Sequence, residues 1–308
     1  MKINLLLTIA AAATLLTACN KDNEPETPWN GEIRLTTATA SMDVQSRATQ
    51  DLQSTQFAAN EKVSVFIGEE NAGKSTTYTQ PLEFTANGTG GLTTALDSQP
   101  YFPQSGKGVN IYACYPQGAA TDTTKAQDFT ILADQSIDAN YNKSDLMLGL
   151  PAKNPVTRTS DAVALTFTHQ LSKINIELVA GAGVPNLDGA VVKLKSIVPT
   201  ISFNPKTGIG TNTATGTAAD VTVMKAATAS LKGSAIIIPQ TIPTTQAFIE
   251  VTLKSGGILT HNLAMATAFA SKSVYTYTIT VKLTGLSVKS TITDWTSIGN
   301  AVTGDATM

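Results

Sequence analysis

The feature of this chain that most constrains its fold is a two-residue alternation of apolar and polar side chains in residues 273–283, which read SVYTYTITVKL. From Tyr275 onward the odd positions carry large apolar side chains, and the even positions from Thr276 carry three threonines and a lysine. Side chains point alternately to the two faces of a β-strand. The segment is therefore predicted to be a strand with one face in a hydrophobic core and the other toward water.

Similar strand signals recur along the chain. They lie in residues 33–37, 63–67, 109–115 and 163–167. An apolar run in residues 235–239, which ends at Pro239, predicts an interior strand. Residues 248–259 predict two strands joined by a hairpin turn at Gly256 and Gly257. No segment shows the period of an amphipathic helix over three turns. Many short strands between turn residues predict an all-β fold of sandwiches or barrels.

The N-terminus carries a targeting segment that is excluded from the fold. Lys2 is followed by an apolar run in residues 5–16, and Leu-Thr-Ala then precedes Cys19. Residues 1–18 are predicted to be a lipoprotein signal peptide whose removal leaves Cys19 as the lipidated N-terminus, held to a membrane by acyl chains such as palmitate. The alternative is an ordinary signal peptide with a coincidental cysteine.

Composition and charge favour a secreted β-rich body. Charged residues make up 14% of the chain and the formal net charge is -2, so no nucleic-acid partner is expected. The sequence contains two cysteines, Cys19 and Cys114. With Cys19 lipidated, Cys114 is left without an intramolecular disulfide partner and is predicted to be a small buried residue.

Residues 65–75, VFIGEENAGKS, match the spacing of a phosphate-binding loop after a strand. Such a loop works only when a helix follows, because the helix N-terminus and the loop N–H groups converge on phosphate. The next residues, TTYTQP, are β-branched and proline-containing and form helices poorly. Gly68, Gly73 and Lys74 are therefore predicted to lie in a solvated hairpin loop, with no nucleotide or other cofactor bound.

The histidines do not predict a catalytic or metal site. His169 and His261 are far apart in sequence and lack the spacing of metal ligands. His169 lies in phase with the apolar face of residues 163–171, and this phase reverses after Lys173. We therefore expect a β-bulge or bend within one long strand, with His169 partly buried and hydrogen bonded beside it. No catalytic residues are assigned, and the chain is predicted not to be an enzyme.

An ordered set of short motifs resembles the fimbrillin-like family of type V pili. After the lipobox come residues 46–49 (SRAT), 63–66 (VSVF), 111–116 (IYACYP), 133–136 (ADQS), 144–147 (SDLM), 165–174 (LTFTHQLSKI), 238–240 (IPQ) and 292–295 (ITDW). The most specific are the segment that contains Phe167, His169 and Lys173, and the terminal motif that ends at Trp295. These four residues form the structural signature of the resemblance.

The resemblance implies two tandem transthyretin-like β-sandwich domains, placed here at residues 48–158 and 159–308. It also implies export as a lipoprotein to the outer membrane and assembly into a surface-exposed pilus. In stalk and tip subunits of the family, an arginine-specific protease removes the lipidated segment with the first strand. A C-terminal strand of another pilin subunit then fills the groove, and strand addition of this kind propagates head to tail.

On this sequence the resemblance places the cut between Arg47 and Ala48. The lipidated N-terminal segment, with its removable first strand, then comprises residues 19–47. The polar surroundings of Arg47 suit an accessible loop, although an ordinary surface arginine is the alternative. Arg34 competes as a cleavage site but lies in the apparent first strand, residues 32–39. The possible donor strand is residues 285–308, of which residues 288–295 can equally be the last strand of the second domain.

Three other interpretations stay open. The chain can be an uncleaved pilus anchor that keeps its lipid, or a surface lipoprotein that binds a glycan or a host or bacterial surface ligand without polymerising. A secreted hydrolase is disfavoured, because the chain has few histidines and no resolvable acid pair.

Overall fold

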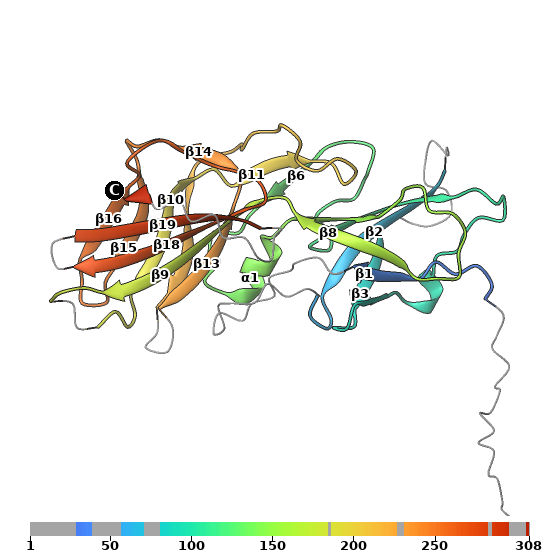
Figure 1. The fold of residues 1–308 in the computed structure, drawn as a ribbon, viewed down its shortest axis with the longest axis horizontal. Coiled ribbons are helices and arrows are strands. Elements are labelled where there is room, and N and C mark those ends of the chain that lie inside the picture. Colours follow the sequence, from blue (N-terminus) through green and yellow to red (C-terminus); the bar gives the residue numbers. More distant parts are fainter. Residues whose placement is uncertain are drawn as a thin grey trace, which may run out of the picture. The chain divides into compact units, whose positions relative to one another are not determined.

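The computed structural model describes residues 29–38, 57–70, 81–183, 186–226, 231–282, 285–295 and 306–307 (Figure 1). In these residues the regular structure is almost entirely β-strand, joined by one short α-helix, α1 (Asp138–Lys143), and one 3-10 turn, η1 (Leu96–Ser98). The all-β prediction is confirmed. The transthyretin-like topology stays a prediction.

The first group of strands closes into a barrel. Its members are β1 (Leu35–Ala38), β2 (Lys62–Glu69), β3 (Leu82–Ala86), β4 (Gly91–Thr93), β5 (Val109–Tyr115), β7 (Met147–Pro151) and β8 (Val163–His169), and the strand order is β1-β4-β3-β2-β5-β7-β8. β2 and β3 form an antiparallel pair. Closure comes from β1, which pairs with β4 on one side and in parallel with β8 on the other.

Three buried aromatic side chains pack together in the first group of strands and the segment before β2. Phe57 lies edge-on to Phe167 with ring centroids 4.8 Å apart and also contacts Tyr115. Gly149 pairs directly with Phe167 across β7 and β8. A Cβ atom at Gly149 would lie 2.7 Å from the Phe167 ring, so this close approach requires glycine.

The remaining strands form two larger sheets and two small ones. The four-stranded sheet has the order β12-β10-β15-β16 and the five-stranded sheet the order β13-β9-β18-β19-β20, while β6 pairs with β11 and β14 with β17. The bounds are β6 (Gln127–Thr130), β9 (Ser172–Ala180), β10 (Val191–Ile197), β11 (Thr200–Phe203), β12 (Ala219–Lys225), β13 (Lys232–Ile237), β14 (Gln240–Ile242), β15 (Ala247–Thr252), β16 (Ile258–Asn262), β17 (Thr267–Phe269), β18 (Ser273–Lys282), β19 (Gly285–Asp294) and β20 (Ala306–Thr307).

The four- and five-stranded sheets share one hydrophobic core. Ile174 and Ile176 of β9 and Ile279 of β18 belong to the same buried cluster as Val192 of β10 and Val251 of β15. In β18 the residues from Tyr275 alternate between buried and half-buried, as the period of two predicts. The hairpin predicted around Gly256 is confirmed as the antiparallel pair β15 and β16.

Three local predictions from the sequence are wrong. The predicted long strand is broken at Gln170 and Leu171: β8 belongs to the barrel and β9 to the five-stranded sheet. The last strand of the barrel in sequence, β8, ends at His169, and the division into domains at residue 158 stays a prediction. Gly68 lies inside β2, opposite Asn110 of β5, and not in a loop. Among the described residues β13 pairs only with β9, so it is an edge strand and not an interior one.

Candidate functional site

The first candidate site is the seam at which β1 closes the barrel. Four consecutive residues of β1 pair with residues 163–166 of β8, and two of them also pair with β4. Just before the strand, the Ile33 N–H donates to the Pro100 carbonyl at 2.8 Å, and Gln99 Nε2 donates to the Ile33 carbonyl at 3.0 Å. The N-terminal segment is thus hydrogen bonded on both sides.

The seam also buries apolar side chains. Ile33 and Leu35 are almost completely buried, and Leu35 lies beside Leu92 and Val163 in the neighbouring strands. Each fully buried side chain of this size contributes roughly 1.5–3 kcal/mol. Removal of the segment would expose these contacts and leave the facing edges of β4 and β8 unpaired, a condition that favours addition of another strand.

The predicted lipidation and cleavage residues, Cys19, Arg47 and Ala48, lie outside the described residues, as do Gly73 and Lys74. The competing Arg34 immediately precedes β1, and its side chain pairs with Glu32 at 3.3 Å. Its carbonyl accepts a hydrogen bond from the Val163 N–H at 2.8 Å. Because a protease binds its substrate in an extended, accessible form, this backbone pairing makes Arg34 a poor cleavage site.

The second candidate site is a buried cluster around His169 at the end of β8. His169 Nδ1 lies 2.9 Å from Asp145 Oδ1. The Trp295 indole stacks on the imidazole ring with centroids 3.8 Å apart and an interplanar angle of 9°. All three side chains are buried. Phe167, two residues earlier, points instead into the barrel interior against Phe57.

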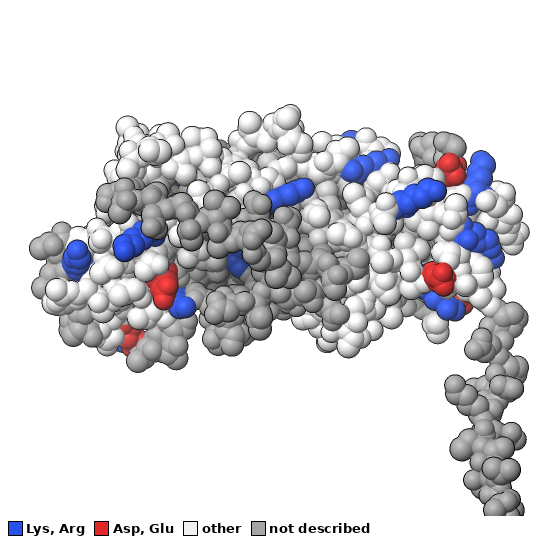
Figure 2. Space-filling model, viewed as in Figure 1, with Lys and Arg blue, Asp and Glu red and all other residues white. Residues whose placement is uncertain are grey.

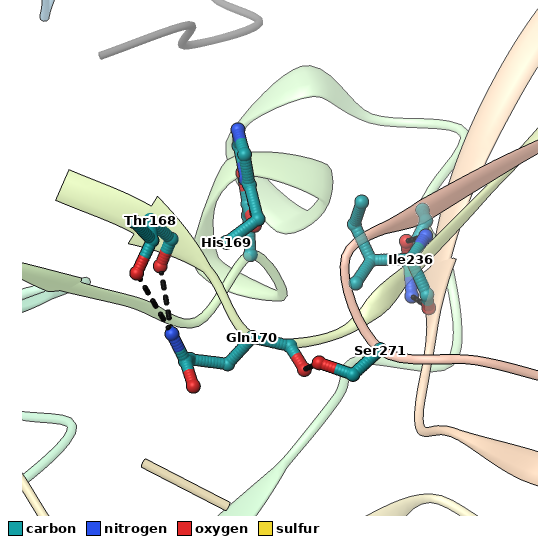
Figure 3. A network of polar contacts seen from close by, with 7 residues as sticks. Thr168, His169, Gln170, Ile236 and Ser271 are labelled. Carbon is teal, nitrogen blue, oxygen red and sulfur yellow. Dashed lines mark hydrogen bonds and ion pairs between the residues drawn. The ribbon is translucent and has the colours of Figure 1, made fainter. Parts of the chain in front are cut away.

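A set of backbone and hydroxyl hydrogen bonds links this cluster to the crossing between β8 and β9. The Trp295 N–H donates to the Lys272 carbonyl, and the Lys272 N–H donates to the Leu171 carbonyl, both at 2.8 Å. In Figure 3 the Gln170 side chain turns back to Thr168, and the Ser271 hydroxyl donates to the Gln170 carbonyl at 2.7 Å. These bonds tie Trp295 to residues 170–171, where the chain passes from the barrel to the five-stranded sheet.

Lys173, the remaining signature residue, is buried, and burial lowers the pKa of its ammonium from 10.5 to about 7. Between these values the unfolded chain binds a proton that the folded chain lacks, so stability rises with pH from about 7 toward 10. The destabilisation is fully present below pH 7. Lys173→Met is expected to remove this slope and to raise the free energy of unfolding by about 1–4 kcal/mol near pH 6.

Urea unfolding near pH 6, 8 and 9.5 measures this effect, with Lys289→Met as the matched control because Lys289 is exposed on β19. An unchanged pH slope in the Lys173 variant would contradict the assignment.

The C-terminal strand β19 is fully paired within its own chain. All ten of its residues, Gly285–Asp294, pair with β18, and Lys289 and Ser290 also pair with β20. The next residue, Trp295, is buried in the His169 cluster. In this structure residues 285–294 thus form a strand of the five-stranded sheet, between β18 and β20, and Trp295 anchors its end.

Two important residues were not assigned roles from the sequence. Asp145 is the partner of His169, and Gln135 hydrogen bonds both to Ile236 of β13 and to Thr222 of β12. Both lie in motifs that contributed to the resemblance, but neither motif has a period that reveals its contact. A buried histidine does require a polar partner, and that requirement was the available signal for Asp145.

The described residues carry scattered charge on the face shown in Figure 2, where lysines and acidic side chains are interspersed among uncharged residues. Within the described ranges no three histidine, cysteine or acidic side chains gather as a metal-binding group. His169 lies in β8 and His261 in β16, in different sheets. No described helix is both long and apolar enough to cross a membrane.

The closed barrel, the two sheets with a common core and the stacked tryptophan at their crossing define an all-β protein whose first strand closes the barrel between β4 and β8. The sequence pattern of the fimbrillin-like family matches residues 46–295, and the chain belongs to that family.

Comparisons with individual proteins agree in fold. A candidate fimbrium subunit of Bacteroides uniformis, Fim1C, is 27% identical over 318 residues, which cover 99% of this chain and 100% of the relative. The crystal structure of a candidate cell adhesion protein from Bacteroides uniformis is similar with a TM-score of 0.67 and 22% identity, covering 86% of this chain and 98% of that one. A further candidate cell adhesion protein, from Bacteroides ovatus, gives a TM-score of 0.65 at 19% identity, with 87% and 98% covered.

Proposed function

We propose that this chain is a structural subunit of a cell-surface type V pilus that assembles by donor-strand exchange and supports adhesion. The observation that supports the proposal most directly is the seam of β1, because one short segment closes the barrel between β4 and β8. Membership of the fimbrillin-like family, and the name of the relative Fim1C as a fimbrium subunit, also support a role as a pilus subunit.

Maturation follows from the position of this segment. The chain is exported as a lipoprotein anchored through Cys19 to the outer membrane, and an arginine-specific protease cuts between Arg47 and Ala48. The cut lies after β1 in sequence, so the released N-terminal piece contains the whole strand and the lipid. Loss of Ile33 and Leu35 from the barrel supplies the drive to accept a replacement strand.

The donor is restricted by the pairing of β19. Donation of residues 285–294 would break the pairing with β18 along the whole strand and would remove Trp295 from its buried position. The donating part of the predicted segment 285–308 is therefore proposed to be the thirteen residues after Trp295, TSIGNAVTGDATM. Among the described residues, their donation would break only the two-residue pairing of β20 with β19. Their few apolar side chains favour a tip or anchor position over a stalk position. The two domains are proposed to be transthyretin-like modules.

Limited digestion of the mature protein with an arginine-specific protease tests this function. We expect one cut that leaves Ala48 as the new N-terminus, followed by oligomers in size-exclusion chromatography. The variant Arg47→Ala is expected to stay uncut and monomeric, whereas Arg34→Ala behaves as the parent. Mass spectrometry reads the new terminus.

Resistance of the parent chain at Arg47 would exclude the cleaved stalk or tip role and leave an uncleaved anchor. Cleavage at Arg47 without any oligomer would instead favour a non-polymerising surface lipoprotein. Oligomers that form equally well from Arg47→Ala would overturn strand exchange triggered by the cut.

A further inference from the structure

An open groove lies next to the ends of the barrel strands β2 and β5. It has a volume of about 570 Å³ and is lined by residues 60–62, 115–119, 128–130, 132, 139 and 142–143. These segments include the start of β2, the end of β5, strand β6 and the last turn of α1. The size is that of ordinary small-molecule sites, roughly 300–1,000 Å³.

Several polar side chains that line the groove are unpartnered. Within the described part of the chain, the side chains of Asn60, Gln117, Asp128, Asn142 and Lys143 make no hydrogen bond or ion pair. Three of the five are amides, each of which can donate and accept at once. Such groups can satisfy a ligand that offers many hydroxyls, because a hydroxyl also donates and accepts.

The base of the groove is held by a hydrogen bond, and the lining carries no excess of positive charge. The Tyr115 hydroxyl donates to Glu61 Oε2 at 2.9 Å. Burial raises the pKa of Tyr115, so the hydroxyl keeps its proton. Lys62 forms an ion pair at 2.6 Å with Glu83, which does not line the groove. The other charged side chains of the lining are one lysine, Lys143, and two acids, Glu61 and Asp128. The groove therefore lacks the concentrated positive charge that an anionic ligand needs.

The lining also includes apolar surface. Pro116, Ala119 and Leu132 contribute to the walls, and Leu132 is 37% exposed. A pyranose ring has an apolar face of C–H groups and an edge of hydroxyls, so it matches a site that mixes short apolar side chains with amides. An uncharged peptide would use the amides less completely, because its backbone offers fewer polar groups per unit of surface.

We propose that this groove binds a neutral oligosaccharide of about two to three sugar rings. The inference does not depend on strand exchange, because all the lining residues belong to the single chain and lie outside the β1 seam. The cut at Arg47 and the binding of sugar are measured separately, so failure of one leaves the other standing.

The test uses the full mature chain and saturation-transfer NMR followed by calorimetric titration with cellotriose, maltotriose, lactose and N-acetyllactosamine. At least one is expected to bind with a Kd below about 10 mM. Gln117→Ala and Asn142→Ala are each expected to weaken that binding about fivefold. The control Asn262→Ala, on the distant edge strand β16, should leave it unchanged.

Gln117 is exposed and its side chain contacts no other polar group, so its variant should keep the parent's melting temperature and isolate the effect on binding. Absence of binding to all four sugars at about 10 mM would overturn the proposal. Sugar binding that is unaffected by both groove variants, or stronger binding of an uncharged tripeptide that the groove variants abolish, would overturn it as well.

Discussion

Trp295→Ala is expected to lower the free energy of unfolding by about 3–5 kcal/mol, the range for loss of a fully buried large aromatic side chain. Trp295 is completely buried and heads the largest buried side chains of the described residues. Its ring covers the His169 imidazole at 3.8 Å. Truncation would leave a cavity next to the buried pair of His169 and Asp145, which cannot relax without breaking their 2.9 Å contact.

Urea unfolding with matched variants checks this prediction. Ile292→Ala is the control, because Ile292 is 49% exposed on β19, the strand that ends just before Trp295, and its truncation should cost less than about 1 kcal/mol. A double-mutant cycle of Trp295→Leu with His169→Ala should give a coupling of roughly 0.5–1.5 kcal/mol for the ring stack. A cost for Trp295→Ala within the range of the control would show that the cluster does not hold the sheet crossing.

The strands themselves were predictable from the sequence, because the period of two is a local property of a half-buried strand. The alternation from Tyr275 and the hairpin at Gly256 required no knowledge of distant contacts. Both were found where the pattern placed them.

The arrangement of these strands was not predictable in the same way. A reversal of apolar phase after Lys173 is compatible with a bulge in one strand or with passage between two sheets, and only the partners of each half distinguish them. β8 pairs with β7 and β1, and β9 pairs with β13 and β18. The contact of His169 with Trp295 joins residues that are far apart in sequence, so no local period could reveal it.

The position of β13 within its sheet could not be predicted from its apolar sequence either. Ala235, Ile236 and Ile237 are completely buried, which is typical of interior strands. Yet among the described residues β13 has a neighbouring strand on one side only. Its other side must satisfy its backbone groups without a strand, since unpaired buried backbone is costly. Gln135 does this.

Gln135 joins the edges of two sheets. Its side-chain Nε2 donates to the Ile236 carbonyl at 2.8 Å, and its Oε1 accepts from the Ile236 N–H at 2.7 Å. Its backbone N–H donates to the Thr222 carbonyl of β12 at 2.9 Å. The primary amide therefore hydrogen bonds to Ile236 as a paired strand residue would, while the backbone of residues 134–135 pairs beside Thr222 of β12.

Gln135→Ala is expected to lower the free energy of unfolding by about 2–4 kcal/mol, because it leaves the buried N–H and C=O of Ile236 unsatisfied. Gln246→Ala is the matched control: its side chain is exposed, and its loss should stay within about 0.5 kcal/mol. Native-state hydrogen exchange should also show faster exchange of the Ile236 amide in the Gln135 variant.

Gln135→Glu separates the two hydrogen bonds from simple loss of volume. A carboxylate of nearly the same shape can still accept from the Ile236 N–H, but it cannot donate to the Ile236 carbonyl and it buries a charge. Gln135→Glu should therefore be at least as unstable as Gln135→Ala near neutral pH and should recover part of the loss as the carboxyl is protonated in acid. If glutamate were tolerated at neutral pH while alanine was not, packing and not the paired hydrogen bonds would be what Gln135 supplies to the edge of β13.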